Sequence, residues 1–346
     1  SSKIPNVELS NGVLMPQLAI GTAPLSAEPG QSVASNPRFI GFFPERVYRS
    51  VHLALSAGMR HIDTALMYRS QEPIARVLGH WFMEGKLKRE DLFLTSKVYH
   101  PPSPPSFDIN DTCVDMDNLT VEQVEAKLHE HFQRVLAELG LGYVDLMLLH
   151  WPSSGGEGGH VQSAGEGEEK RPIQMADIDP NKRAKRIAAW KVLEHYYSIG
   201  LCRAIGVSNF NELHLQHLME DGAKVRPQVN QIETSVYIQH KSIIKYCMEN
   251  DIAVVAYSPF GRGVMSIEDD EVILSIAEKH SVSPGHVALH FLTQQGISAA
   301  FFSSSEERIK SNMNVFSLEL DDDDIKALSA LNRSASWGLP SPFMLS

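Results

Sequence analysis

Three ionisable side chains stand directly after short apolar or β-rich runs in the first half of the chain: Asp63, Lys97 and His150. Tyr68 follows Asp63 by five residues. If these runs are parallel strands of a closed barrel, their C-terminal ends gather on one rim, where separate segments converge. An acid, an amine, an imidazole and a phenol would then meet there. Such a set can deliver a proton to a carbonyl oxygen.

Each of these residues also has a structural interpretation. Asp63 could cap the segment that follows it, His150 could be a hydrogen-bonded core histidine, and Tyr68 could be an ordinary packing residue. Lys97 is harder to explain in this way, because a lysine that ends a buried strand needs a partner. The combination of the four residues therefore favours a functional site.

A metal-dependent barrel hydrolase is a second possibility. His61 and Asp63 are two residues apart on one expected strand, so their side chains point to the same side, and His100 and His150 could add further ligands. Lys97 would compete with a bound cation, and zinc ligands need supporting hydrogen bonds. We therefore predict no metal at this site.

Strand and helix signals alternate along the chain. The expected strands are 17–21, 60–64, 92–97, 144–150, 204–208, 227–231, 253–257 and 298–301. Eight such strands with helices between them predict an α/β fold, specifically a (β/α)₈ TIM barrel. A doubly wound sheet is the alternative, but no glycine-rich phosphate-binding turn follows the first strand.

Segments outside the expected strands complete this architecture. The Asn11-Gly12 pair lies between short apolar runs and predicts an N-terminal β-hairpin, because both residues tolerate positive φ; the hairpin would cap one end of the barrel. Helices are expected at 121–139, 183–198 and 272–280. The basic run 182–186 is expected on a solvated helix face.

Long βα loops are expected on the same rim as the polar side chains. They cover 23–45, 99–120 and 152–182, and the Gly-, Ser- and Glu-rich stretch 153–170 is expected to be a mobile loop. The tail 337–346 is short and could cross the opening of the barrel.

Size and composition are those of a globular protein. The chain has 346 residues, 43% of them hydrophobic, and barrels of this length commonly form one domain, here 1–346. A net charge of −11 argues against nucleic-acid binding. No run approaches the ~20 apolar residues of a membrane span, and the first residues lack a secretory signal. Cys113, Cys202 and Cys247 have no metal-ligand spacing and fit a reducing compartment, so a cytoplasmic location is expected.

Several short stretches together match a known family. They are Gly21-Thr22, 61–65 with Tyr68, 95–97, 145–152, 206–210, 230–233, 257–259, Arg308-Ile309 and Asn312. In their order and spacing the chain resembles the aldo-keto reductase family over nearly its whole length. The resemblance implies a monomeric (β/α)₈ barrel that reduces a small carbonyl compound, an aldehyde or a ketone, to an alcohol, usually with NADPH.

The resemblance assigns a role to each residue of the polar set. Tyr68 is the general acid, and the Lys97 ammonium would lower the pKa of this phenol below its usual value near ~10. Asp63 pairs with Lys97 and keeps it charged. His150 orients the substrate oxygen, and the hydride comes from the cofactor.

The resemblance also assigns the cofactor contacts. Ser208, Asn209 and Gln231 match the residues that bind the nicotinamide amide, and Tyr257 matches the ring that stacks on the nicotinamide. The full set of cofactor positions is Gly21, Thr22, Asp63, Ser208, Asn209, Gln231, Tyr257, Ser258, Phe260, Arg262, Ser303, Arg308 and Asn312.

The chain departs from the family at two places. Phe302 replaces the lysine usually found near the 2′-phosphate of NADPH, so NADH remains possible as the cofactor. At the substrate end, Tyr99 stands where the family often has tryptophan, while Trp151 is retained; both are expected to bind the substrate. The identity of that substrate stays open, because the long loops have no match.

A non-enzymatic alternative keeps the cofactor and loses turnover. Some barrels that resemble this family are regulatory subunits of potassium channels, and the long loops here could be partner surfaces. A pure cofactor binder needs no proton donor, however. The presence of Asp63, Tyr68, Lys97 and His150 therefore favours an enzyme.

Overall fold

The computed structural model describes residues 4–23, 43–102, 110–153, 180–261 and 266–333. Eight parallel strands close into a barrel in the order β10-β3-β4-β5-β6-β7-β8-β9. Their bounds are β3 Leu18–Gly21, β4 His61–Asp63, β5 Phe93–Val98, β6 Val144–Leu149, β7 Cys202–Ser208, β8 Val229–Glu233, β9 Ala253–Tyr257 and β10 Ser298–Phe301. The predicted (β/α)₈ barrel is confirmed. Most of the stretch 153–170 and the whole tail 337–346 lie outside the described residues.

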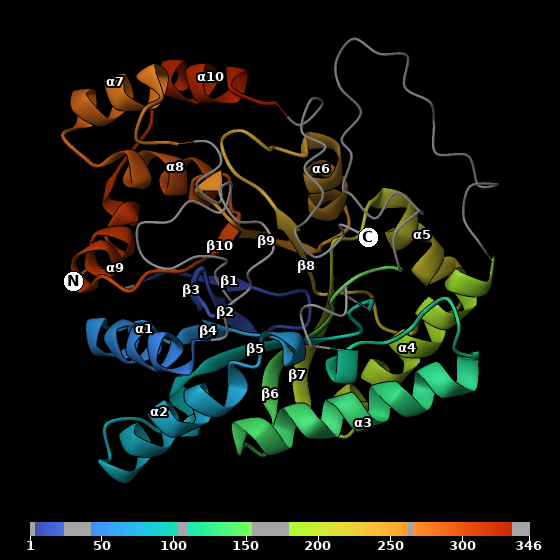
Figure 1. The fold of residues 1–346 in the computed structure, drawn as a ribbon. Coiled ribbons are helices and arrows are strands. Elements are labelled where there is room, and N and C mark those ends of the chain that lie inside the picture. Colours follow the sequence, from blue (N-terminus) through green and yellow to red (C-terminus); the bar gives the residue numbers. More distant parts are fainter. Residues whose placement is uncertain (1–3, 24–42, 103–109, 154–179, 262–265, 334–346) are drawn as a thin grey trace.

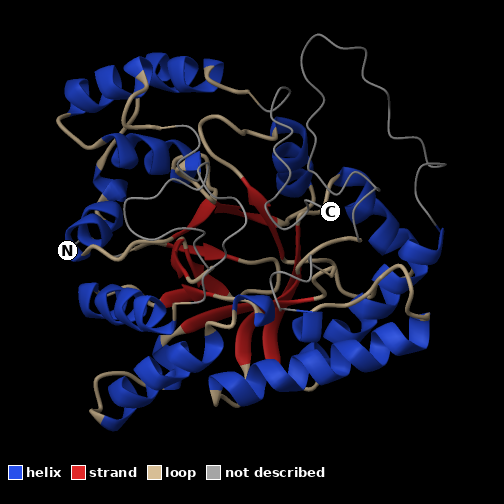
Figure 2. Ribbon diagram, in the orientation of Figure 1, coloured by secondary structure: helices blue, strands red, loops and turns tan. Residues whose placement is uncertain are grey.

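Helices surround the barrel on all sides in the view of Figures 1 and 2. They are α1 Pro44–Ala57, α2 Gln71–Met83, α3 Val121–Leu139, α4 Pro180–Ser198, α5 Glu212–Glu220, α6 Lys241–Glu249, α7 Glu271–His280, α8 Pro284–Thr293, α9 Glu306–Met313 and α10 Asp322–Ala330. None of the helices in the described ranges is long and apolar enough to cross a bilayer.

Local signals in the sequence explain the bounds of α3. Thr120 accepts a hydrogen bond from the Gln123 N–H at 3.3 Å, and the Gln123 side chain accepts one from the Thr120 N–H at 2.9 Å. This reciprocal pair satisfies two free donors at the helix start. At the other end Gly140 adopts a φ of 63°, which ends the helix at Leu139.

The N-terminal hairpin, β1 Asn6–Glu8 and β2 Leu14–Pro16, packs against the barrel interior. Leu9 and Met15 are buried and belong to the same apolar cluster as the inward-facing side chains of the strands. The hairpin was predicted, but its turn differs in detail. Only Gly12 has positive φ, whereas Asn11 uses its side chain to accept from the Val13 N–H.

The barrel is closely packed around Gly206 in β7. A Cβ atom at this position would lie 2.5 Å from the Val229 carbonyl oxygen and 2.8 Å from Leu148 Cδ2. Any larger side chain would push neighbouring strands apart. Glycine is therefore required here by the approach of two strands.

The basic run was expected on a solvated face, and this is wrong for two of its members. Lys185 and Arg186 are buried. The Lys185 ammonium donates to the Met116 carbonyl at 2.8 Å, and the Arg186 guanidinium donates to the Pro152 carbonyl at 2.9 Å. The start of α4 thereby holds the segments that follow β5 and β6.

Candidate active site

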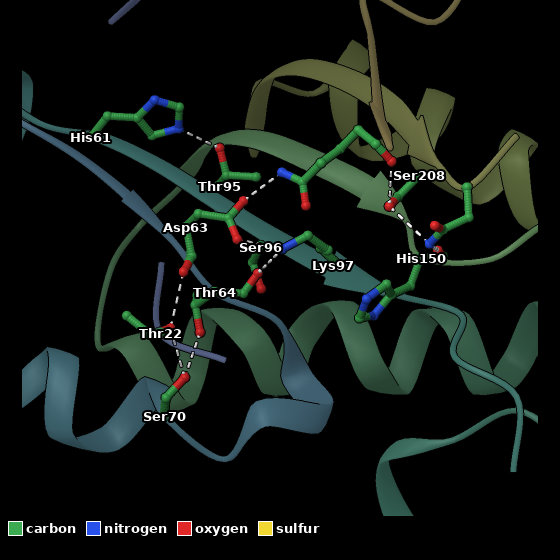
Figure 3. A network of polar contacts seen from close by, with 12 residues as sticks. Thr22, His61, Asp63, Thr64, Ser70, Thr95, Ser96, Lys97, His150 and Ser208 are labelled. Atoms are coloured by element: carbon green, nitrogen blue, oxygen red, sulfur yellow. Dashed lines mark hydrogen bonds and ion pairs between the residues drawn. The ribbon is translucent and has the colours of Figure 1, made fainter. Parts of the chain in front are cut away.

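A buried ion pair lies at the C-terminal ends of two neighbouring strands. The Lys97 ammonium on β5 donates to Asp63 Oδ1 on β4 at 2.6 Å and to the Thr64 carbonyl at 2.9 Å (Figure 3). Lys97 is 1% exposed. Burial holds the pKa of Lys97 below its ordinary value, and the adjacent Asp63 carboxylate opposes that shift.

The second oxygen of Asp63 is also bound. The Gln231 amide on β8 donates to Asp63 Oδ2 on β4 at 2.7 Å. The carboxylate therefore links three strands across the barrel. It is fixed in place before any ligand binds, which favours a site with preset charges.

Tyr68 approaches this ion pair from the short 3₁₀ helix Leu66–Tyr68 that follows β4. The Tyr68 ring centroid lies 4.9 Å from the Lys97 ammonium and 5.7 Å from the His150 ring, with an interplanar angle of 77° to that ring. The four side chains predicted from separate segments are therefore neighbours on one rim. This geometry places a phenol beside both a cation and an imidazole.

His150 follows β6 and is held by its backbone. Its N–H donates to the Val98 carbonyl at 2.7 Å, and its carbonyl accepts from the Asn209 side chain at 3.0 Å. Burial, then the nearby His100 and Lys97, lower the pKa of His150 well below its usual value. The imidazole is therefore neutral at pH 7. Within the described part of the chain its buried Nδ1 has no hydrogen-bond partner.

Amide and hydroxyl groups line the neighbouring strand ends. Asn209 follows β7 with a φ of 63°, and its side-chain oxygen accepts from the Tyr257 hydroxyl at 2.7 Å. The Ser208 hydroxyl donates to the Gln231 carbonyl at 2.8 Å. These contacts hold Ser208, Asn209 and Gln231 together, with the half-buried Tyr257 beside them. A donor and acceptor set of this kind fits a planar carboxamide such as that of nicotinamide.

Gly21 and Thr22 support the site from β3. Gly21 pairs with Asp63 in the sheet, and the Thr22 hydroxyl donates to the Asp63 carbonyl at 2.9 Å. Thr22 also shares a hydrogen bond with Ser70, which in turn contacts Thr64 (Figure 3). Ser70 and Thr64 were not predicted, because small hydroxyl residues carry no distinctive pattern in a sequence.

Residues assigned to the far end of the cofactor lie after β9 and β10. Ser258 turns the chain with a φ of 53°, and the Phe260 ring lies 6.3 Å from that of Phe301. Ser303 is buried, while Arg308 is exposed in the first turn of α9. Asn312 lies near the start of α8, with its side-chain oxygen about 4 Å from where a Gly285 Cβ would be. Arg262 falls outside the described residues.

His100 is the main neighbour of the site that the sequence did not assign to the reaction. Its ring lies 5.0 Å from that of His150 and 6.2 Å from that of Trp151, and burial lowers its pKa to about 4. Tyr99 and Trp151, predicted to bind substrate, are both buried at this rim. His100 follows Tyr99, whose φ is 68°; such strain is visible only in the structure.

His61 does not join this group. Its ring contacts the Pro16 carbonyl and the Thr95 hydroxyl, both at 2.9 Å, and so faces the hairpin end of the barrel. Among the described residues no three His, Cys, Asp or Glu side chains form a possible metal site. The metal-dependent hydrolase needs His61 on the same side as Asp63 and His150, and the contacts of the His61 ring with Pro16 and Thr95 do not favour it.

The fold and this rim define a class of barrel oxidoreductases that act on carbonyl groups. The sequence model of the Aldo/keto reductase family matches residues 41–333, and the chain belongs to this family. Aldose reductase C of Dictyostelium discoideum is 32% identical over 339 residues, 98% of this chain and 92% of that protein. Human aldo-keto reductase family 1 member C1 is 30% identical over 346 residues, 97% and 94% of the two chains.

A solved structure has the same fold. The Bombyx mori aldo-keto reductase in complex with NADP superposes with a TM-score of 0.73 at 27% identity, covering 96% of this chain and 94% of that one. The chain is thus an oxidoreductase that reduces carbonyl compounds with NADPH. The regulatory-subunit alternative is not favoured.

Proposed function

We propose that the chain reduces an aldehyde or ketone with Tyr68 as the general acid. The observation that carries this proposal is the position of the Tyr68 ring beside both the Lys97 ammonium and the His150 imidazole. Reduction leaves negative charge on the carbonyl oxygen, which must be protonated or stabilised by donors. NADPH, when bound, supplies the hydride.

Each residue of the rim has a defined part in the proton transfer. The Tyr68 hydroxyl gives its proton to the substrate oxygen, and the Lys97 ammonium stabilises the phenolate that remains. Asp63 fixes the position of that ammonium through the 2.6 Å contact. The neutral His150 ring donates a hydrogen bond that orients the carbonyl oxygen, while Tyr99 and Trp151 contact the rest of the substrate.

The proposed cofactor position follows the same rim. Ser208, Asn209 and Gln231 hold the carboxamide, and the hydrogen bonds that join these three residues support this position. The Tyr257 ring stacks on the nicotinamide. Ser258 and Phe260 lie along the pyrophosphate, for which the sequence also predicts Arg262, and Ser303, Arg308 and Asn312 hold the adenosine end.

The remaining expectations are part of the proposal. Residues 1–346 act as one domain, supported by barrel strands that come from both halves of the chain. We expect a monomer, as the family resemblance implies. The buried thiols of Cys113, Cys202 and Cys247 agree with a reducing compartment such as the cytoplasm.

The test is a panel of aldehydes and ketones incubated with the protein and NADPH or NADH, followed at the nicotinamide absorbance. The proposal predicts substrate-dependent oxidation of NADPH, and the reverse reaction with the product alcohol and NADP⁺. Tight NADPH binding without turnover on any carbonyl would instead indicate the regulatory protein. The ratio of rates with NADPH and NADH would settle the preference that Phe302 leaves open.

A further inference from the structure

Arg46 packs beside Phe302, the residue that stands where the family usually has a lysine near the 2′-phosphate. The Arg46 guanidinium carbon is 5.9 Å from the centroid of the Phe302 ring and 5.5 Å from that of Phe43. Arginine stacks well on aromatic faces because its guanidinium is flat and weakly hydrated. The two rings therefore hold a cation next to the segment that follows β10.

The same face of α1 is fastened to that segment. Ser50 lies four residues after Arg46, so both side chains are on one side of the helix. The Ser50 hydroxyl donates to the Ser303 carbonyl at 2.7 Å, and α1 packs against α9. Arg308 occupies the first turn of α9. Arg46 and Arg308 thus flank the segment 302–305 from two different helices.

Two of the acidic residues next to these arginines in the sequence form ion pairs with other side chains. Glu45 pairs with Arg76 at 3.1 Å, and Glu306 pairs with Lys310 at 2.6 Å. Glu307 is exposed in the first turn of α9. Two arginines beside the segment 302–305 make a site whose charge suits a phosphate monoester, while the Ser303 hydroxyl bonds Ser305 within the segment.

We propose that Arg46 binds the 2′-phosphate of the cofactor's adenosine together with Arg308, and that Phe302 supports the Arg46 guanidinium instead of contacting the phosphate. This rests on the proposed function, which places the adenosine end at Ser303, Arg308 and Asn312. The cation that selects NADPH over NADH then comes from α1, at the start of the barrel, and not from the residue after β10. Phe302 is a positioning residue in this arrangement.

Calorimetric titration with 2′,5′-ADP and 5′-AMP tests the assignment without any turnover. These probes differ by one phosphate group. The wild-type protein should bind 2′,5′-ADP more tightly than 5′-AMP. Arg46→Gln should weaken the binding of 2′,5′-ADP by about tenfold or more, which is the effect of losing a charged hydrogen bond. The same change should alter the affinity for 5′-AMP by less than about twofold. Arg49→Gln, which removes the same charge from the same helix, should leave both affinities within about twofold.

A second variant guards against a merely structural effect. Phe302→Lys introduced into the Arg46→Gln protein should restore part of the preference for 2′,5′-ADP. Retention of the full preference in Arg46→Gln, or an equal loss in Arg49→Gln, would overturn the assignment. The assignment would also be overturned if the wild-type protein bound both probes equally and still oxidised NADPH. That result would leave the proposed function intact. Failure to bind NADPH or NADH at all would overturn the proposed function with it.

Discussion

At the residue scale the site depends on Lys97, whose buried position disfavours the charged ammonium. Lys97 and Asp63 are both buried, and the desolvation of such a pair can cost as much as the ions gain from their attraction. The extra contacts to Thr64 and Gln231 engage a second donor of the ammonium and the second oxygen of the carboxylate. An apolar pair of similar volume would fill the same space at little cost in stability. We therefore attribute the charge to the reaction.

Substitution at this pair should separate stability from activity. Lys97→Met leaves the Asp63 carboxylate buried without its cation, so we expect a loss of about 3–5 kcal/mol in the free energy of unfolding and a fall in kcat of ~10² or more. Lys97→Met combined with Asp63→Asn removes the unpaired charge. The double variant should regain much of the stability and none of the activity, as measured by urea unfolding and steady-state rates. Recovery of the rate in the double variant would mean that the ammonium has no chemical role.

Residues of the site were predictable to different degrees. Asp63, Lys97 and His150 could be found because each ends a recognisable strand, and parallel strands of a barrel end on one rim. The contact of Gln231 with Asp63 could not, because the residues are 168 positions apart and no local signal joins them. Arg46 could not either, since its neighbour Phe302 belongs to the other end of the chain.

At the element scale, α4 holds two of the loops around the site. The Arg186 guanidinium donates to the Pro152 carbonyl just after β6 and lies 6.0 Å from the Phe210 ring just after β7. These two segments carry Trp151 and Asn209. A helix outside the barrel thus positions residues on its rim.

Loss of this link should affect substrate binding more than the chemical step. We expect Arg186→Met to raise the KM for the carbonyl several-fold, to change kcat little, and to lower stability by about 1–3 kcal/mol because the Pro152 carbonyl stays buried without its donor. Arg183→Gln is a matched control on the same helix: among the described residues it breaks the pairs with Glu220 and Asp221, whose value is up to about 1 kcal/mol. Equal KM values for the wild type and Arg186→Met would argue against the link.

Sequence patterns placed the elements well where local signals set their ends. The bounds of α3 follow from Thr120 and Gly140, while β8 begins two residues later than predicted, after Pro227. The basic run at the start of α4 was misjudged because charged side chains usually lie in water. Here Lys185 and Arg186 meet loop carbonyls, and the sequence does not reveal which loops a helix will touch.

At the scale of the whole molecule, several buried histidines make stability depend on pH. Burial lowers the pKa values of His100, His131 and His240 to about 4, against about 6.5 in the unfolded chain. Between pH 4 and 6.5 the unfolded chain therefore binds more protons than the folded one. The free energy of unfolding then rises with pH in this window, and each histidine adds at most ~1.4 kcal/mol per pH unit.

Thermal unfolding should follow this dependence. The Tm should change little from pH 8 to 7 and fall steadily from pH 6.5 to 4.5. His131 is fully buried on α3, so His131→Leu should make the fall shallower by removing one of the titrating groups. A Tm that is constant down to pH 4.5, or a His131→Leu protein with an unchanged slope, would contradict this explanation.

The most direct test of the central claim is the single-turnover rate of NADPH oxidation by Tyr68→Phe at saturating carbonyl. This change removes one hydroxyl and keeps the ring beside Lys97. If Tyr68 gives its proton to the substrate oxygen, the rate should fall by ~10²–10⁴ relative to the wild type, with the affinity for NADPH unchanged by fluorescence titration. A Tyr68→Phe rate within about twofold of the wild type, under the same saturation, would contradict it.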